Sequence, residues 1–327
     1  MRLIDLYQKC IYLGIEYDPR PVEEIEKNLA RVAKQYEDLK DQEKQYFDRE
    51  RLKNPYADTR ILNGDPEVEV NRIFAGIDIE AQEIILADRL REKGEKIDLI
   101  LSHHPEGKAL VSLHKVMSLQ EDVLAQLGVP INVAEGILAS RISEVERGLM
   151  PLNHNRSVDA ARLLNFPFMC VHTPADNMVN TYLTNLFAEK KPETVGDVID
   201  ILLEIPEYQE SKKIDAGPKV FLGKEKNRAG KIFVDMTGGT GGSEDAFAKL
   251  AIAGVGTIVG MHIGEKHRKE AEKNHINVII AGHMASDSLG LNLLLDQLGK
   301  DDNLEVIPCS GLIRVERCNL KLDHSNQ

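Results

Sequence analysis

The sequence predicts an α/β protein with two lobes, in which parallel-rich sheets are flanked by helices, and an added N-terminal helical segment. The C-terminal third alternates apolar strands with amphipathic helices, and this order favours βα units with parallel pairing and right-handed crossovers. A chain of 327 residues with 42% hydrophobic residues is long enough to bury more than one core. Two domains are therefore the default expectation at this length.

The N-terminal segment is dominated by one amphipathic helix. Its apolar side chains recur at spacings of three and four, and they are Val22, Ile25, Leu29, Val32, Tyr36 and Leu39. This spacing predicts a helix with a narrow apolar seam, which suits packing against the chain's own domain or a neighbouring subunit better than an independent coiled coil. We assign residues 1–56 to an N-terminal helical extension, 57–190 to a first α/β lobe and 191–327 to a second.

The middle of the chain offers weaker patterns. Residues 119–149 indicate a helix, a short strand and a second helix. Residues 194–204 predict a helix, and the polar, turn-rich residues 206–230 that follow predict a domain boundary or a flexible loop.

The most informative motif is a pair of adjacent histidines, His103 and His104, at the end of a short apolar strand that begins near Asp98. Pro105 ends that strand directly after the pair. Neighbouring side chains point to opposite faces within a strand, so two adjacent imidazoles share one region only where the strand ends. The pair predicts a metal centre, and a solvated turn is the alternative.

Two further motifs repeat this arrangement. The apolar strand at residues 277–280 is followed by His283, with Asp287 four residues later on the same face if a helix begins there. Helix capping is the alternative for Asp287. The apolar residues 168–171 lead into His172 and Asp176, whose carboxylate is able to complete a mixed nitrogen and oxygen ligand set. An ordinary polar loop is the alternative there.

A glycine cluster lies between a predicted strand and a predicted helix, and it comprises Gly238, Gly239, Gly241 and Gly242. Its spacing matches neither a dinucleotide-binding fingerprint nor an NTPase phosphate loop. A ligand-binding loop and a tight structural turn both remain open.

In this order, the strings HHP, HTPAD and GHMASD resemble the Nif-three-like family of dinuclear-metal-centre proteins, described as GTP cyclohydrolase type 2-like. The resemblance covers about residues 57–104 and 165–316. It implies the metal ligands His103, His104, Asp176, His283 and Asp287. The family usually has glutamate where this chain has Asp287. The aspartate side chain is shorter by one methylene, which changes how its carboxylate reaches two ions and which metal it prefers. His262 and His267 precede the last motif, and neither is predicted to be a ligand.

The resemblance implies two divalent metal ions, zinc, manganese or iron, which activate a water molecule for hydrolysis. It also implies a small-molecule substrate of the nucleotide type, with the opening of the GTP purine ring as the family's reaction, and a ring-shaped homo-oligomer, a hexamer being the expected size. His172 is the candidate catalytic residue, which moves protons or orients a ligand, and a purely structural histidine is the alternative. The competing hypothesis is a non-catalytic metal-binding regulatory or scaffold protein.

Composition sets outer limits on function. The formal net charge of -12 disfavours nucleic acid or an anionic membrane as a partner, because phosphate groups favour clustered Lys and Arg. The four cysteines, Cys10, Cys170, Cys309 and Cys318, form no CxxC pair and suggest reduced thiols. Neither a secretory leader nor a membrane-spanning apolar run is evident, so the expected location is the cytoplasm.

Overall fold

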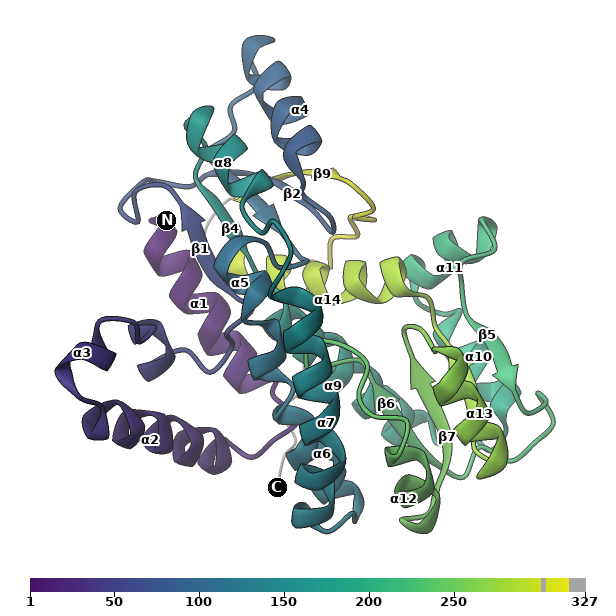
Figure 1. Ribbon diagram of the computed structural model, residues 1–327. Coiled ribbons are helices and arrows are strands. Elements are labelled where there is room, and N and C mark those ends of the chain that lie inside the picture. Colours follow the sequence, from purple (N-terminus) through teal and green to yellow (C-terminus); the bar gives the residue numbers. More distant parts are fainter. Residues whose placement is uncertain (301–303, 318–327) are drawn as a thin grey trace.

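The computed structural model describes residues 1–300 and 304–317. Figure 1 shows two sheets flanked by helices. The first sheet has the order β1-β4-β3-β2-β9, with β1 Arg60–Asn63, β2 Arg72–Gly76, β3 Leu99–Ser102, β4 Phe168–Cys170 and β9 Glu305–Cys309. The second has the order β5-β8-β7-β6, with β5 Lys219–Leu222, β6 Lys231–Asp235, β7 Val255–Gly260 and β8 Asn277–Ile280.

Both sheets are mainly parallel, as the sequence predicts. Within the first, β9 pairs with β2, β2 with β3 and β3 with β4, all in parallel, and β1 is an antiparallel edge strand. Within the second, β6, β7 and β8 pair in parallel and β5 is the antiparallel edge. The α/β class with two sheets flanked by helices is confirmed. After completing the second sheet, the chain returns to the first, because β9 pairs with β2. The division into two lobes at residue 190 stays a prediction.

Helices fill the connections between strands. Those before residue 130 are α1 Leu3–Glu16, α2 Val22–Asp38, α3 Asp41–Lys44, η1 Arg49–Leu52, α4 Ala81–Glu92, α5 Gly107–Val111, η2 Leu113–Val116 and α6 Leu119–Leu127. Those after it are α7 Ile131–Leu149, α8 Arg156–Leu163, α9 Thr173–Lys190, α10 Val195–Leu202, α11 Pro206–Lys213, α12 Ala246–Ile252, α13 Glu265–Lys273 and α14 His283–Leu298.

Two local predictions are wrong. No strand lies between α6 and α7, because Pro130 immediately precedes the first turn of α7 and its fixed φ suits a helix start. Residues 206–230 are not a loop throughout, since Pro206 opens α11 and residues 219–222 form β5. The edge strand β5 exists through its pairing with β8, a contact that local composition does not reveal.

The N-terminal extension is helical, and its helices differ in burial. α1 packs against α9 and α14 and contributes Leu3, Leu6 and Cys10 to the main core. α2 is the predicted amphipathic helix, but Ile25 is its one fully buried side chain. In Figure 1, α2 and α3 lie apart from the sheets.

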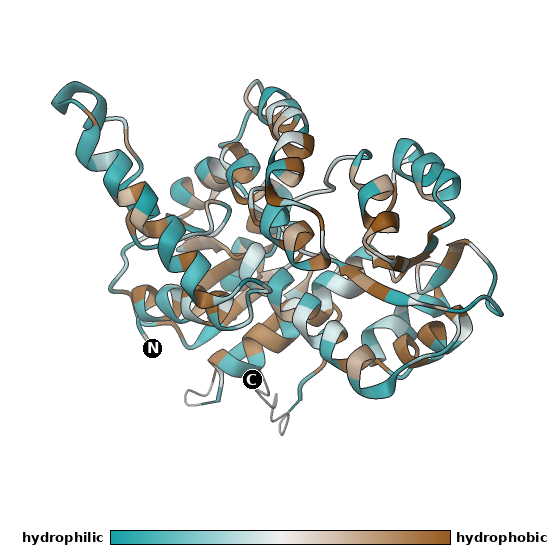
Figure 2. Ribbon diagram, turned by 90° about the horizontal axis from the view of Figure 1, so that it is seen from below, coloured by the Kyte–Doolittle hydropathy of each residue, from teal (hydrophilic) through white to brown (hydrophobic). Residues whose placement is uncertain are grey.

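The main core lies between the two sheets, where α9 and α14 pack together. Each helix begins directly after a central strand, α9 after β4 and α14 after β8. A Cβ atom added at Gly290 of α14 would lie 2.5 Å from the carbonyl oxygen of Ala175 in α9, so the close packing requires glycine. Figure 2 shows hydrophobic ribbon towards the centre and hydrophilic ribbon on many outer turns.

Two further features concern membrane-spanning helices and the cysteines. No helix in residues 1–300 or 304–317 is both long and apolar enough to cross a membrane. Cys10, Cys170 and Cys309 are free thiols, and Cys318 lies outside the described residues.

Candidate metal centre

The six residues singled out as candidate ligands or catalytic groups converge at one point between the two sheets. Two directly follow β3, two stand at the start of α9 and two near the start of α14. In chain order they are His103, His104, His172, Asp176, His283 and Asp287. Each follows the carboxyl end of a parallel strand, which is where open α/β sheets place their binding sites.

One group of these side chains is almost completely buried. His103 Nε2 lies 3.4 Å from Asp176 Oδ1 and 3.6 Å from Asp287 Oδ1. The three residues offer ligand atoms within 4.8 Å of one another. His103 is 0% exposed, Asp176 5% and Asp287 1%.

A second group shares Asp287 and reaches the solvent. The other carboxylate oxygen, Asp287 Oδ2, lies 3.4 Å from His104 Nε2 and 3.4 Å from His283 Nε2. The i, i+4 spacing of His283 and Asp287 at the start of α14 is as the sequence suggested. The two oxygens of Asp287 thus face two different groups of ligand atoms.

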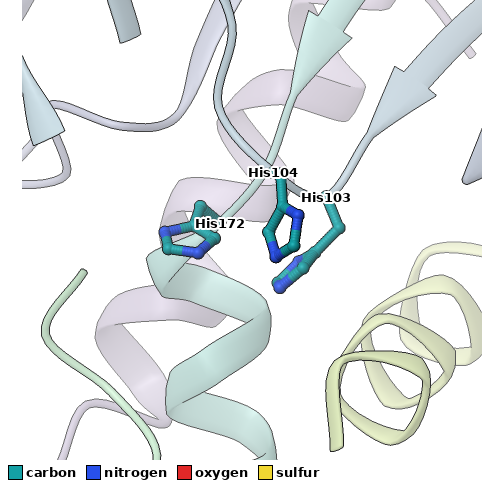
Figure 3. Close-up of side chains that lie close together, drawn as sticks. All are labelled: His103, His104 and His172. Atoms are coloured by element: carbon teal, nitrogen blue, oxygen red, sulfur yellow. The ribbon is translucent and has the colours of Figure 1, made fainter. Parts of the chain in front are cut away.

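Hydrogen bonds made by Nδ1 orient the rings of the three histidines that Figure 3 shows. His103 Nδ1 donates to the carbonyl oxygen of Val171 at 3.1 Å, and His104 Nδ1 donates to Asp78 at 2.6 Å. His172 Nδ1 donates to Asp58 at 2.9 Å. With each Nδ1 serving as the donor, each Nε2 faces the shared centre, an arrangement typical of metal-binding histidines.

The buried polar atoms of this centre fit a cation. His103 Nε2, Asp176 Oδ1 and both carboxylate oxygens of Asp287 are buried and have no hydrogen-bond partner within the described part of the chain. Buried carboxylate oxygens without a donor are costly, and a metal ion satisfies several of them at once. Imidazole nitrogens mixed with carboxylate oxygens suit zinc, manganese or iron.

Electrostatics support the same conclusion. Burial lowers the pKa of His103, but the carboxylates of Asp287 and Asp176 outweigh burial and raise it to about 10. Burial also lowers the pKa of His104, and the neighbouring carboxylates of Asp287 and Asp78 raise it to about 9. Burial raises the pKa of Asp287, and the neighbouring histidines reverse this and hold it far below its usual range. Without metal, protons therefore occupy the lone pairs that a metal ion would use.

Metal binding is expected to release about two protons per chain near neutral pH, because His103 and His104 must lose theirs to become ligands. Metal affinity should therefore rise as pH rises towards 9 and 10. In the metal-free protein, the raised pKa values contribute stability below the ordinary value of 6.5, and this contribution is lost as pH rises through 9 to 10. Calorimetric titration with zinc in two buffers of different ionisation enthalpy measures the release. An affinity that is independent of pH would contradict this account.

A cavity of about 820 Å³ opens beside the cluster and is lined by the exposed side of His104, by His172 and by residues 239–242 of the glycine cluster. Gly238 and Gly239 have φ values of 95° and 85°, and an added Cβ would lie 2.5 Å from Gln120 and 2.7 Å from Val116, respectively. Gln120 donates to the carbonyl oxygens of residues 238 and 240. These glycines make a tight turn against α6 and η2, and the turn also forms a cavity wall.

Neither of the two histidines upstream of the last motif joins a group of potential ligand atoms within the described residues. The ring of His262 lies 5.3 Å from that of His283. His267 donates from Nε2 to the carbonyl oxygen of Gly242 at 2.9 Å, which gives it a structural role.

Asp58 is a site residue that sequence reasoning missed. It is fully buried, and it accepts hydrogen bonds from His172 Nδ1 and from the Thr173 hydroxyl at 2.6 Å. Asp58 and His172 are 114 residues apart, and no local pattern marks Asp58. It holds His172 with Nε2 facing Asp176, 3.7 Å away.

A comparison with solved structures agrees with this fold. A NIF3 superfamily protein from Sphaerobacter thermophilus superposes with a TM-score of 0.69 at 25% identity, over 80% of this chain and 94% of that chain. Reduced HcgD from Methanocaldococcus jannaschii superposes with a TM-score of 0.49 at 17% identity, over 76% of this chain and 87% of that chain. A Bacillus cereus protein related to NIF3 superposes with a TM-score of 0.42 at 11% identity, over 77% of this chain and 89% of that chain. No family model and no curated protein matches the chain. The first superposition, together with the ordered histidine and aspartate motifs, supports the assignment of this chain to the NIF3 superfamily.

Proposed function

We propose that this protein is a metal-dependent hydrolase with a dinuclear centre that acts on a nucleotide or a related small molecule. The observation that carries the proposal is the position of Asp287, whose two buried oxygens face separate groups of ligand atoms. His103 and Asp176 accompany Oδ1, and His104 and His283 accompany Oδ2. One carboxylate is thereby available to two ions.

The chemistry that such a pair of ions supplies is a bound water of lowered pKa and an electrophilic site for a substrate oxygen. The protein's own contribution is orientation. Asp78 and the carbonyl oxygen of Val171 fix the rings of His104 and His103, and the packing of α9 on α14 fixes the separation of Asp176 from Asp287.

His172 is proposed to move a proton during the reaction. Asp58 accepts from its Nδ1, which leaves Nε2 as the atom that takes a proton and delivers it to the leaving group. His172 lines the large cavity beside Asp176, so a bound substrate lies within its reach. The volume of about 820 Å³ lies within the range of small-molecule and cofactor sites, and it has room for a nucleotide.

The variant His172→Asn is expected to keep its metal and to lose turnover by a factor of about 100 or more, the usual contribution of a positioned proton-transfer group. The measurement is a screen of nucleotides and phosphate esters with protein reconstituted separately with zinc, manganese and iron. The variant Asp58→Asn should lose less, by about tenfold to 100-fold, because it acts through the orientation of His172.

Two other outcomes assign different roles. Loss of metal from His172→Asn would make His172 a ligand, since it also lies within 4.8 Å of the ligand atoms of His103 and His104. Absence of turnover with every metal, together with an assembly that falls apart when the metal is chelated, would favour the scaffold function instead.

A further inference from the structure

The backbone of α14 sets the position of the Asp287 carboxylate, because no hydrogen bond holds the carboxylate itself. Both of its oxygens are buried and have no hydrogen-bond partner in the described structure. A single methylene joins this carboxylate to the main chain, so it follows any movement of the first turns of α14. The residues on either side, Ser286 and Ser288, are fully buried, and each forms hydrogen bonds with a different neighbouring segment.

Ser286 is held from α11. Its hydroxyl donates to the carbonyl oxygen of Gly282 at 2.7 Å. With that proton in use, the hydroxyl of Tyr208 is the donor in the contact of 3.0 Å between the two side chains. Tyr208 lies on α11 and is fully buried. A helix that contributes no predicted ligand thus holds the residue before Asp287.

Ser288 is held by residues 310–317, which follow β9 and which we call the C-terminal strap. Its hydroxyl donates to the carbonyl oxygen of Gly311 at 3.3 Å and accepts from the N–H of Ile313 at 3.0 Å. One turn further along α14, the side chain of Asn292 donates to the carbonyl oxygen of Ile313 at 2.8 Å. The strap therefore runs along α14 and holds the residue after Asp287.

The start of the strap also contacts the first sheet beside another predicted ligand. The N–H of Ile77, the residue after β2, donates to the carbonyl oxygen of Ser310 at 3.0 Å. The carbonyl oxygen of Ile77 in turn accepts from the N–H of His104 at 2.9 Å. The strap thus joins the backbone around His104 to the backbone around Asp287.

A buried ion pair ties the strap to α11. The guanidinium of Arg317 donates from Nη1 to Glu207 Oε1 at 2.7 Å, and its Nη2 bonds to the other oxygen. Glu207 is fully buried, precedes Tyr208 on α11, and also accepts from Asn292 at 2.8 Å. Bidentate pairs of this kind fix orientation as well as distance. The pair closes a loop of contacts around Asp287.

We propose that five residues form a clamp that positions the Asp287 carboxylate between the two groups of ligand atoms. They are Glu207, Tyr208, Ser286, Ser288 and Arg317. They act through the backbone of α14 and bind no ion themselves. Metal ligands must lie within a few tenths of an ångström of their ideal distances, so a shift of this carboxylate weakens the hold on both ions. The role rests on the metal centre of the proposed function, whichever reaction that centre performs.

The test compares Tyr208→Phe and Ser288→Ala with the wild type. Each variant removes one hydroxyl and leaves every predicted ligand in place. Zinc affinity is measured by calorimetric titration of the metal-free protein, and the visible spectrum of the cobalt-loaded protein reports ligand geometry. We expect zinc affinity to fall by about tenfold to 100-fold, the usual loss for a residue that orients a ligand, and the cobalt spectrum to change. The two losses should be non-additive in the double variant, because both hydroxyls hold the same carboxylate.

The variant Thr257→Val is the matched control. Thr257 lies on β7 and is fully buried, and its hydroxyl donates to the carbonyl oxygen of Ala229 at 2.6 Å and accepts from Asn277 at 3.3 Å. The substitution removes a buried hydroxyl with as many hydrogen bonds as that of Ser288, away from the clamp. It should lower the midpoint of urea unfolding, with zinc affinity and the cobalt spectrum unchanged.

The variant Arg317→Gln tests the ion pair. It leaves Glu207 buried without its charged partner, so the midpoint of urea unfolding should fall. Zinc affinity should fall as well, by about tenfold or more, because the strap is then no longer tied to α11.

The inference is wrong if Tyr208→Phe and Ser288→Ala unfold at lower urea concentrations and still bind zinc and cobalt as the wild type does, since the contacts are then structural only. If the wild type binds neither metal, the clamp and the proposed function both fail. If the variants weaken zinc binding as expected and the metal-loaded wild type turns over no compound, the clamp stands and the proposed hydrolase function fails.

Discussion

The variant Asp287→Ala is expected to lose its metal. Its metal affinity should fall by more than about 100-fold, because substitution of a residue that only orients a metal ligand already lowers affinity by about 10-fold to 100-fold. In the wild type, both carboxylate oxygens of Asp287 are buried and have no hydrogen-bond partner, and together they contact three of the four other predicted ligands. Its removal therefore affects both groups of ligand atoms. The measurement is metal content per chain by elemental analysis of identically purified proteins.

Two comparisons sharpen this experiment. Asp296→Ala changes a carboxylate on the same helix, but Asp296 pairs with Arg314 and lies outside the groups of potential ligands, so this control should keep its metal. The double variant His103→Ala, His104→Ala should lose metal as Asp287→Ala does. If Asp287→Ala retains the metal content of the wild type, the assignment of the centre is wrong.

The variant Gly290→Ala is expected to destabilise the protein by about 1–3 kcal/mol, the usual range for overpacking a core. Alanine favours helices, but its Cβ would lie 2.5 Å from the backbone oxygen of Ala175, and a backbone atom yields only if α14 moves away from α9. Because Ala175 precedes Asp176, and Gly290 lies one turn after Asp287, the same movement separates two of the proposed metal ligands. The measurement is the midpoint of urea unfolding of the metal-free protein.

A matched substitution isolates this contact from helix propensity. An added Cβ at Gly136 in α7 would have no heavy atom within 4 Å, so Gly136→Ala should stabilise the protein by about 0.5–1 kcal/mol. Opposite signs for the two alanine variants are the expected result. Stabilisation by both would show that α9 and α14 tolerate greater separation than their packing indicates.

The sequence predicted those parts of the fold and centre whose signals are local. The histidine and aspartate motifs fall at strand ends, and the apolar runs before them are readable by themselves, as at residues 99–102 and 277–280. The i, i+4 pair of His283 and Asp287 is readable too, because it lies within one turn of a helix.

The features that could not be predicted from the sequence depend on contacts with residues far away along the chain. β5 forms through pairing with β8, and β9 completes the first sheet after the chain has built the second. Asp58 matters because it accepts a hydrogen bond from His172, 114 residues away. Such features become visible only in the folded chain, because they depend on contacts between segments far apart in the sequence.

The packing of α9 against α14 would link the proposed metal binding thermodynamically to the arrangement of the two sheets. Asp176 follows a strand of one sheet, and Asp287 follows a strand of the other. An ion held by both is bound tightly in one relative position of the sheets, so its free energy of binding adds directly to the free energy that keeps them in that position. By the same reciprocity, a ligand that draws the sheets closer would tighten the hold on the metal.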